Sequence, residues 1–160
     1  MAFSLSPAAQ DALRSTESVK LVATTGKDGT PHITEKGTLT LRDDGRIAFY
    51  EFIETSQTNK NMVFSLWFSK FVAITALTKD GKSFLIKGKP YKTVIAGQEF
   101  INAYSDAQNR FGKDTDLSAV WLIDPEWERE ETFSVRRHEE ETAHPYEIHI
   151  DRIIKEEYKS

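Results

Sequence analysis

The sequence predicts an antiparallel β-barrel with a few short helices, on two observations. Runs rich in β-branched and aromatic residues recur at short spacing, and Asp-Gly pairs at 28–29, 44–45 and 80–81 separate consecutive runs. Asp-Gly between such runs is a strong signal for a tight turn that joins antiparallel strands. Parallel βαβ units would need longer helical segments between the runs, so a meander or barrel is favoured.

Each element follows from a local pattern. Ser6 and Pro7 open a short helix within residues 1–17, because serine is a good N-cap and proline fits the first helical turn. Apolar spacings predict two further helices, at 61–67 and 97–112. The strand at 117–123 is expected to stop at Asp124 and Pro125. The strands are expected at residues 19–25, 31–41, 47–52, 71–77, 83–95 and 117–123, with a further one at 131–137.

The composition bounds the class of protein. The 160 residues fit one domain, 1–160, in which residues 138–160 form a charged C-terminal arm. A net charge of -4 argues against nucleic acid or an anionic membrane as the main partner. The chain has no cysteine, so disulfides and thiolate metal sites are excluded. No stretch has the length of a membrane span and no secretory signal is recognised, so a cytoplasmic location is expected.

Four segments in order resemble the pyridoxamine 5'-phosphate oxidase-like family of FMN-binding split barrels. They are VKLVATTGKDGTPHI, DDGRIAFYEF, TSQTNKNM and FVAITALTKDGKSFLIKGKP, which together span residues 19–100 for the most part. The resemblance implies an antiparallel split β-barrel that forms a homodimer, with FMN held at the subunit interface. True pyridoxamine-phosphate oxidases usually carry adjacent basic residues on the phosphate-binding segment. This chain has only Lys60 there, so vitamin-B6 oxidation itself is not expected.

The segment 55–61 is the predicted phosphate site. Hydroxyl, amide and lysine side chains meet there where a loop becomes a helix, and a helix N-terminus favours an anion. An ordinary N-cap by Ser56 or Thr58 explains the same residues without a ligand. The resemblance favours the phosphate site, and its residues are Thr55, Ser56, Thr58, Lys60 and Asn61.

Other residues are placed beside the flavin ring by the resemblance alone. Strands two and three contribute one side of the ring, and Ser83 falls where a side chain meets its pyrimidine end. A solvent-facing role on alternating strand positions is an equal alternative for Glu35 and Lys36. Trp121 is a flavin-proximal candidate, although core packing is the commoner role for an aromatic residue. The full set is Glu35, Lys36, Glu51, Phe52, Ser83 and Trp121.

Three functions remain open at this level. The first is an FMN-dependent oxidoreductase acting on a small molecule, in which the flavin performs the chemistry and no catalytic residue is assigned. The second is a non-catalytic barrel that binds FMN, FAD, deazaflavin or haem. The third is a ligand-free dimeric interaction domain. No metal site is expected, because His138 and His144 are six residues apart and do not share a helical face.

Overall fold

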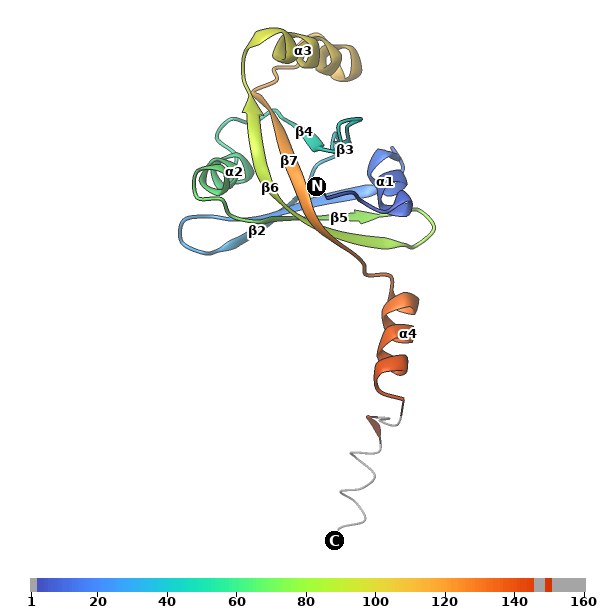
Figure 1. The fold of residues 1–160 in the computed structure, drawn as a ribbon. Coiled ribbons are helices and arrows are strands. Elements are labelled where there is room, and N and C mark those ends of the chain that lie inside the picture. Colours follow the sequence, from blue (N-terminus) through green and yellow to red (C-terminus); the bar gives the residue numbers. More distant parts are fainter. Residues whose placement is uncertain (1–2, 146–148, 151–160) are drawn as a thin grey trace.

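The computed structural model describes residues 3–145 and 149–150 and contains seven strands and four helices in that part of the chain (Figure 1). The order of elements confirms the antiparallel barrel that the sequence predicts. The helices are α1 (Pro7–Arg14), α2 (Gln57–Trp67), α3 (Gly97–Phe111) and α4 (Phe133–Ala143). The strands are β1 (Val19–Thr25), β2 (Pro31–Glu35), β3 (Thr40–Leu41), β4 (Ile47–Glu51), β5 (Val72–Leu77), β6 (Ser83–Val94) and β7 (Ala119–Glu130).

All seven strands form one curled sheet with the order β2-β1-β5-β6-β7-β4-β3, and every neighbouring pair is antiparallel. The long strands β6 and β7 carry the sheet from one half of the barrel to the other (Figure 1). In the same view α1 and α2 lie at opposite ends of the curled sheet, and α3 lies beyond the end of β6 and the start of β7, which it connects (Figure 1).

Two apolar clusters hold these layers together. The larger one fills the inside of the curled sheet and includes Leu13 of α1, Met62 of α2 and Phe49 of β4. The smaller one lies between α3 and the outer face of β4 and β7, around Ala107 and Val120. Buried and less buried residues alternate along β1 and β5, because successive side chains of a strand point to opposite faces of the sheet. Each of these strands therefore contributes every second residue to the inner cluster.

The close approach of β6 and β7 requires a glycine at position 88. A Cβ atom on Gly88 would lie 2.3 Å from the carbonyl oxygen of Asp124. The pairing shifts register immediately before Gly88, and Pro125 is accommodated at that irregularity. The prediction that the strand stops at Asp124-Pro125 is therefore wrong: β7 continues to Glu130. Proline is tolerated within a strand where a bulge removes the need for its N–H.

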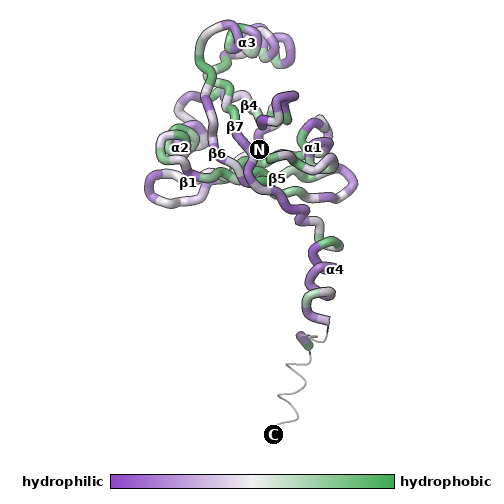
Figure 2. The backbone as a smooth tube through the Cα atoms, in the orientation of Figure 1, coloured by the Kyte–Doolittle hydropathy of each residue, from purple (hydrophilic) through white to green (hydrophobic). Residues whose placement is uncertain are grey.

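Three other elements differ from the prediction. The helix expected at 61–67 begins four residues earlier, at Gln57, because Ser56 caps it there. The segment 31–41 is not one strand, because the chain bends at 36–39 between β2 and β3. The segment 131–137 is not a strand: residues 131–132 connect β7 to α4, and the rest is the start of α4. No residue of α4 is buried, and the helix extends away from the sheet as a mainly hydrophilic element (Figure 2). The predicted arm at 138–160 begins within this helix, and its residues 146–148 and 151–160 lie outside the described part.

No helix in the described part of the chain is long and apolar enough to cross a membrane.

Candidate functional site

The N-terminus of α2 is built by a serine cap. Ser56 has extended backbone angles, and its hydroxyl accepts a hydrogen bond from the Asn59 backbone N–H at 3.0 Å. This confirms the capping role for Ser56. Thr55 and Lys60 flank the cap and are exposed. Lys60 forms no ion pair with any residue that the structure describes. This end of α2 therefore presents a free ammonium and a free hydroxyl to solvent.

Two of the residues predicted to bind phosphate point into the protein interior instead of toward solvent. Thr58 and Asn61 are 1% and 2% exposed. The Asn61 amide nitrogen donates to the Thr24 hydroxyl at 3.0 Å, and its carbonyl oxygen accepts from the Gln57 amide at 2.8 Å. Asn61 thus fastens α2 to the end of β1. The side chains of Thr58 and Asn61 support the helix, and only Thr55, Ser56 and Lys60 of the predicted set lie at the surface.

Lys36 and Glu51 form a largely buried ion pair. The Lys36 ammonium lies 2.8 Å from the Glu51 carboxylate, which also accepts from the Ile53 backbone N–H at 3.1 Å. For Glu35 and Lys36, sequence reasoning weighed a place beside the flavin ring equally against a solvent-facing role. Glu35 is exposed, whereas Lys36 turns inward to Glu51. Through Ile53 and the half-buried Phe52 this pair is joined to the loop that leads into α2.

A second lysine lies beside this pair. The Lys36 backbone N–H donates to the Lys20 carbonyl oxygen at 2.9 Å, so the two lysines are cross-strand neighbours. Lys20 is 4% exposed as a residue. Burial lowers the pKa of Lys20 below its ordinary value, and the positive charge of Arg110 acts in the same direction.

The structure does not bring Trp121 or Ser83 to the solvent-facing side of the N-terminus of α2. Trp121 is 1% exposed, and its indole N–H donates to the Asn59 side chain at 2.8 Å from within the core. Trp121 supports the first turn of α2 from behind, in the core-packing role that sequence reasoning set against a flavin contact. Ser83 pairs with Leu77, whereas Val72 at the other end of β5 follows α2. Five residues of strand separate these ends, a distance of roughly 17 Å.

An apolar cavity of about 540 Å³ opens beside α2. Its walls come from β1, β2, β5, β6 and β7, and its lining residues are Ala23, Thr24, Thr25, Pro31, Phe71, Val72, Ala73, Lys87 and Trp127. Thr24 belongs to the lining but is itself buried, and it receives the Asn61 hydrogen bond on the inner face of β1, so α2 is joined to the cavity wall through this strand and no residue of α2 lines the cavity. The ammonium of Lys87 lies 4.7 Å from the centre of the Trp127 ring. A flat, apolar ring with polar edges is the kind of ligand that such a cavity accepts.

The cavity lies on a sheet face that no other described element covers. Cross-strand partners share a face, so Ala23, Ile33, Ala73 and Lys87 all point outward from β1, β2, β5 and β6. Ile33 is 62% exposed on the edge strand β2 of this face. Sequence reasoning missed these residues. The alternation of small or apolar outward positions with buried ones along β1 is the signal that could have indicated them.

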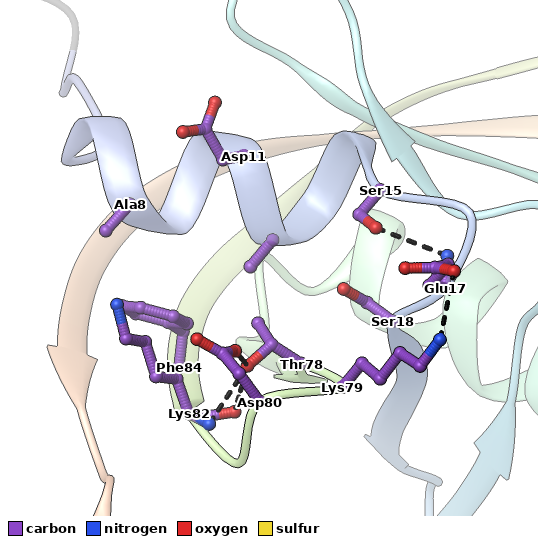
Figure 3. Close-up of a pocket in the computed structure, with 11 residues that line it drawn as sticks. Ala8, Asp11, Ser15, Glu17, Ser18, Thr78, Lys79, Asp80, Lys82 and Phe84 are labelled. Atoms are coloured by element: carbon purple, nitrogen blue, oxygen red, sulfur yellow. Dashed lines mark hydrogen bonds and ion pairs between the residues drawn. The ribbon is translucent and has the colours of Figure 1, made fainter.

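A second cavity, also of about 540 Å³, lies between α1 and the turn that joins β5 to β6 (Figure 3). Some of its polar groups are engaged with one another: the Thr78 hydroxyl with Asp80 at 2.5 Å and Lys79 with Glu17 at 3.4 Å (Figure 3). These contacts hold the turn in shape and connect it to the segment after α1.

Comparison with known proteins identifies the fold. No family model and no curated protein matches the sequence. Solved structures do match. HupZ from Group A Streptococcus is 21% identical over 81% of this chain and 95% of its own, with a TM-score of 0.66. An FMN-binding protein from Syntrophomonas wolfei is 11% identical over 78% of this chain and 84% of its own, with a TM-score of 0.61.

A structure described as an F420 reductase is 16% identical over 78% of this chain and 98% of its own, with a TM-score of 0.58. These likenesses confirm the split-barrel fold that the sequence predicts. Because identities this low show the fold alone, the ligand of this chain has to be inferred from its own residues.

Proposed function

We propose that this protein binds FMN as a homodimer and acts as an oxidoreductase on a small molecule. The observation that carries the proposal is that α2 and the apolar cavity are attached to the same strand, because Thr24 of β1 accepts the Asn61 hydrogen bond and also belongs to the cavity wall. The helix that carries Lys60 and the apolar cavity bounded by Trp127 are therefore neighbours across β1. FMN combines the two matching groups, a phosphate and a flat ring. The FMN-binding and F420-reductase names of two structures with the same fold support this choice.

The residues fit the cofactor in part. A helix N-terminus with an unpaired lysine attracts a phosphate. Thr55, Ser56 and Lys60 would hold that group, whereas Thr58 and Asn61 would act through the fold of α2. Phe71 and Trp127 would contact the ring in the cavity. The single lysine makes a weaker phosphate site than a cluster of basic residues, so we expect modest affinity for FMN.

A second copy of the chain would complete the cavity. The outward face carries Ile33, Phe71 and Trp127 at 62%, 51% and 37% exposure, more apolar surface than an isolated sheet face normally leaves uncovered. A partner on this face would bury these side chains and exclude water from the ring. Bound FMN supplies the electron or hydride transfer, and the protein binds and orients it. The only ionisable side chain in the lining of this cavity is that of Lys87, so it is the one protein group there that can hold a proton or a charge.

That lining also supports the second candidate, a barrel that binds the cofactor without turnover. No carboxylate or histidine lines the cavity to serve as acid or base. The same composition argues against haem, because no histidine, methionine or tyrosine lines it to bind iron. FAD and deazaflavin cofactors remain alternatives, because each also combines a flat tricyclic ring with phosphate. Reduction of bound FMN by NADH or NADPH, followed by reoxidation with an acceptor, would favour the enzyme over the carrier.

The test is a titration of the purified protein with FMN and with riboflavin, which lacks the phosphate. We expect Lys60→Glu to weaken FMN binding by about tenfold or more and to leave riboflavin binding unchanged. Lys113→Glu makes the same charge change at an exposed site after α3 and serves as the control. Equal affinities for FMN in the wild type and in Lys60→Glu would exclude the phosphate site. Failure of the wild type to bind FMN at all would exclude the function.

The dimer has its own test. We expect sedimentation to show a dimer, and we expect Ile33→Glu to give a monomer that also binds FMN less tightly. Ile101→Glu introduces the same charge on α3, where the side chain is 56% exposed, and should leave the dimer intact. An unchanged dimer in Ile33→Glu would place the subunit interface elsewhere.

A further inference from the structure

A third cavity lies between α3 and the β3–β4 edge, away from the proposed flavin site. It has a volume of about 430 Å³. Its floor is apolar and includes Ala48, Ala103 and Val120. Tyr50 points into this cavity from the outer face of β4, whereas its neighbour Glu51 points into the barrel. β4 thus separates this cavity from the Lys36–Glu51 pair.

Charged groups of both signs alternate around the rim. Arg42 contacts Glu99 at 2.7 Å at one end, and Arg110 contacts Asp106 at 3.4 Å at the other. Glu99 and Asp106 are seven residues apart on one side of α3, which corresponds to about 10 Å along the helix axis. The four side chains sum to no net charge. An anion alone or a cation alone would meet both attraction and repulsion here.

Several groups at this cavity keep unused hydrogen-bonding capacity. Arg42 contacts Glu99 through Nη1 and Asp44 through Nη2, which leaves its Nε–H without a partner among the described residues. Oδ2 of Asp106 accepts from both the Tyr50 hydroxyl and Arg110, and Oδ1 has no partner among the described residues. The guanidinium of Arg110 donates through one Nη only and lies 6.0 Å from the Tyr50 ring centre, so its other donors stay available. The Asn102 carbonyl oxygen accepts from Gln98, and the amide N–H groups of Asn102 remain free to donate toward the cavity it lines.

We propose that this cavity binds a small amphoteric molecule that carries a carboxylate and an amine, such as an amino acid or a short peptide. The ammonium of the ligand binds the free oxygen of Asp106, and the carboxylate binds the remaining donors of Arg42 and the amide of Asn102. The apolar floor takes the carbon chain between the two charged ends. This site is independent of the proposed flavin site and requires no FMN.

The test uses three compounds with the same carbon chain: 5-aminopentanoate, pentanoate and pentylamine. Each is titrated into isotopically labelled protein while backbone amide signals are followed by NMR. We expect 5-aminopentanoate to shift the signals of α3 and β4, and the two singly charged compounds to bind at least tenfold more weakly. Equal responses to all three compounds, or no response to any of them, would overturn the proposal.

Two variants locate the site. We expect Asp106→Asn and Arg42→Gln each to weaken binding of 5-aminopentanoate by about tenfold, because each removes one charge-assisted contact. Asp116→Asn is the control, since Asp116 also accepts from a tyrosine, Tyr104, but does not line the cavity. Unchanged binding in both Asp106→Asn and Arg42→Gln would exclude this cavity. If either variant fails to fold, the comparison of the three compounds on the wild type still decides the question.

Discussion

The ammonium of Lys36 lies 2.8 Å from the carboxylate of Glu51, at the point where β4 leads into the loop before α2. Their side chains are 13% and 2% exposed. Each charge in such a pair offsets the desolvation of the other, so the pair matters most when one partner is removed. This arrangement ties the bend after β2 to the segment that positions the N-terminus of α2.

We expect Lys36→Met to lower the free energy of unfolding by about 3–5 kcal/mol, because it leaves the Glu51 carboxylate buried without a counter-charge. The double variant Lys36→Met/Glu51→Leu should be clearly more stable than Lys36→Met alone. Urea denaturation measures both. Lys79→Met, which breaks an exposed pair with Glu17, should cost no more than about 1 kcal/mol. A double variant no more stable than Lys36→Met would contradict the argument.

The crossing of β6 and β7 gives a second prediction. We expect Gly88→Ala to destabilise the protein by roughly 1–3 kcal/mol or more, because the added carbon would meet the rigid carbonyl of Asp124. Gly37→Ala is the matched control, since a Cβ there has nothing within 4 Å. The control should change stability by no more than about 0.5 kcal/mol. Thermal unfolding of the two variants side by side measures the difference, and equal melting temperatures would contradict the close approach.

Local rules explain much of the fold. Ser6 and Ser56 cap the helices that the sequence indicates, and their side chains accept the expected backbone hydrogen bonds. The glycines of the three Asp-Gly pairs all have positive φ, as tight turns between antiparallel strands require. The errors arise where pairing overrides local signals. Pro125 stays within β7 because the bulge opposite β6 removes the need for its N–H.

The candidate site was predictable only where it is continuous in sequence. Thr55, Ser56 and Lys60 lie within one short segment, and a loop-to-helix pattern was enough to select them. The cavity beside α2 is different, because Pro31, Phe71 and Trp127 come from distant segments. Strand register alone brings such residues to one face, and register is not visible in a local pattern.

The attachment of α2 to β1 gives a third prediction. We expect Asn61→Ala to destabilise the protein by about 1–3 kcal/mol, since it removes a buried hydrogen bond and leaves the Thr24 hydroxyl without that partner. Gln57→Ala removes the hydrogen bond that the exposed Gln57 side chain donates to the carbonyl oxygen of Asn61. It should change stability by no more than about 0.5 kcal/mol. Chemical denaturation of both variants measures this contrast. An equal decrease in the free energy of unfolding in the two variants would show that the buried hydrogen bond contributes no more to stability than the exposed one.

The phenol of Tyr50 gives a prediction about pH. Its hydroxyl donates to Asp106 at 2.8 Å. Burial, together with the hydrogen bond to Asp106 and its negative charge, raises the pKa of Tyr50 from 10.0 to about 12, while the Arg110 charge acts in the opposite direction. The folded protein therefore keeps this proton where the unfolded chain loses it. The resulting stabilisation is fully present below pH 10 and is lost as the pH rises through about 12.

We expect an alkaline titration followed by near-ultraviolet absorbance to show a late-titrating phenol that is absent in Tyr50→Phe. Asp106→Asn should lower the pKa of that phenol, because it removes the negative charge that opposes ionisation. Asp116→Asn, which removes the charge beside Tyr104, should leave the Tyr50 step in place. If Tyr50→Phe removed a phenol that titrates at the ordinary value, the Tyr50–Asp106 hydrogen bond would not persist in solution. The rim of the cavity beneath α3 would then be arranged differently.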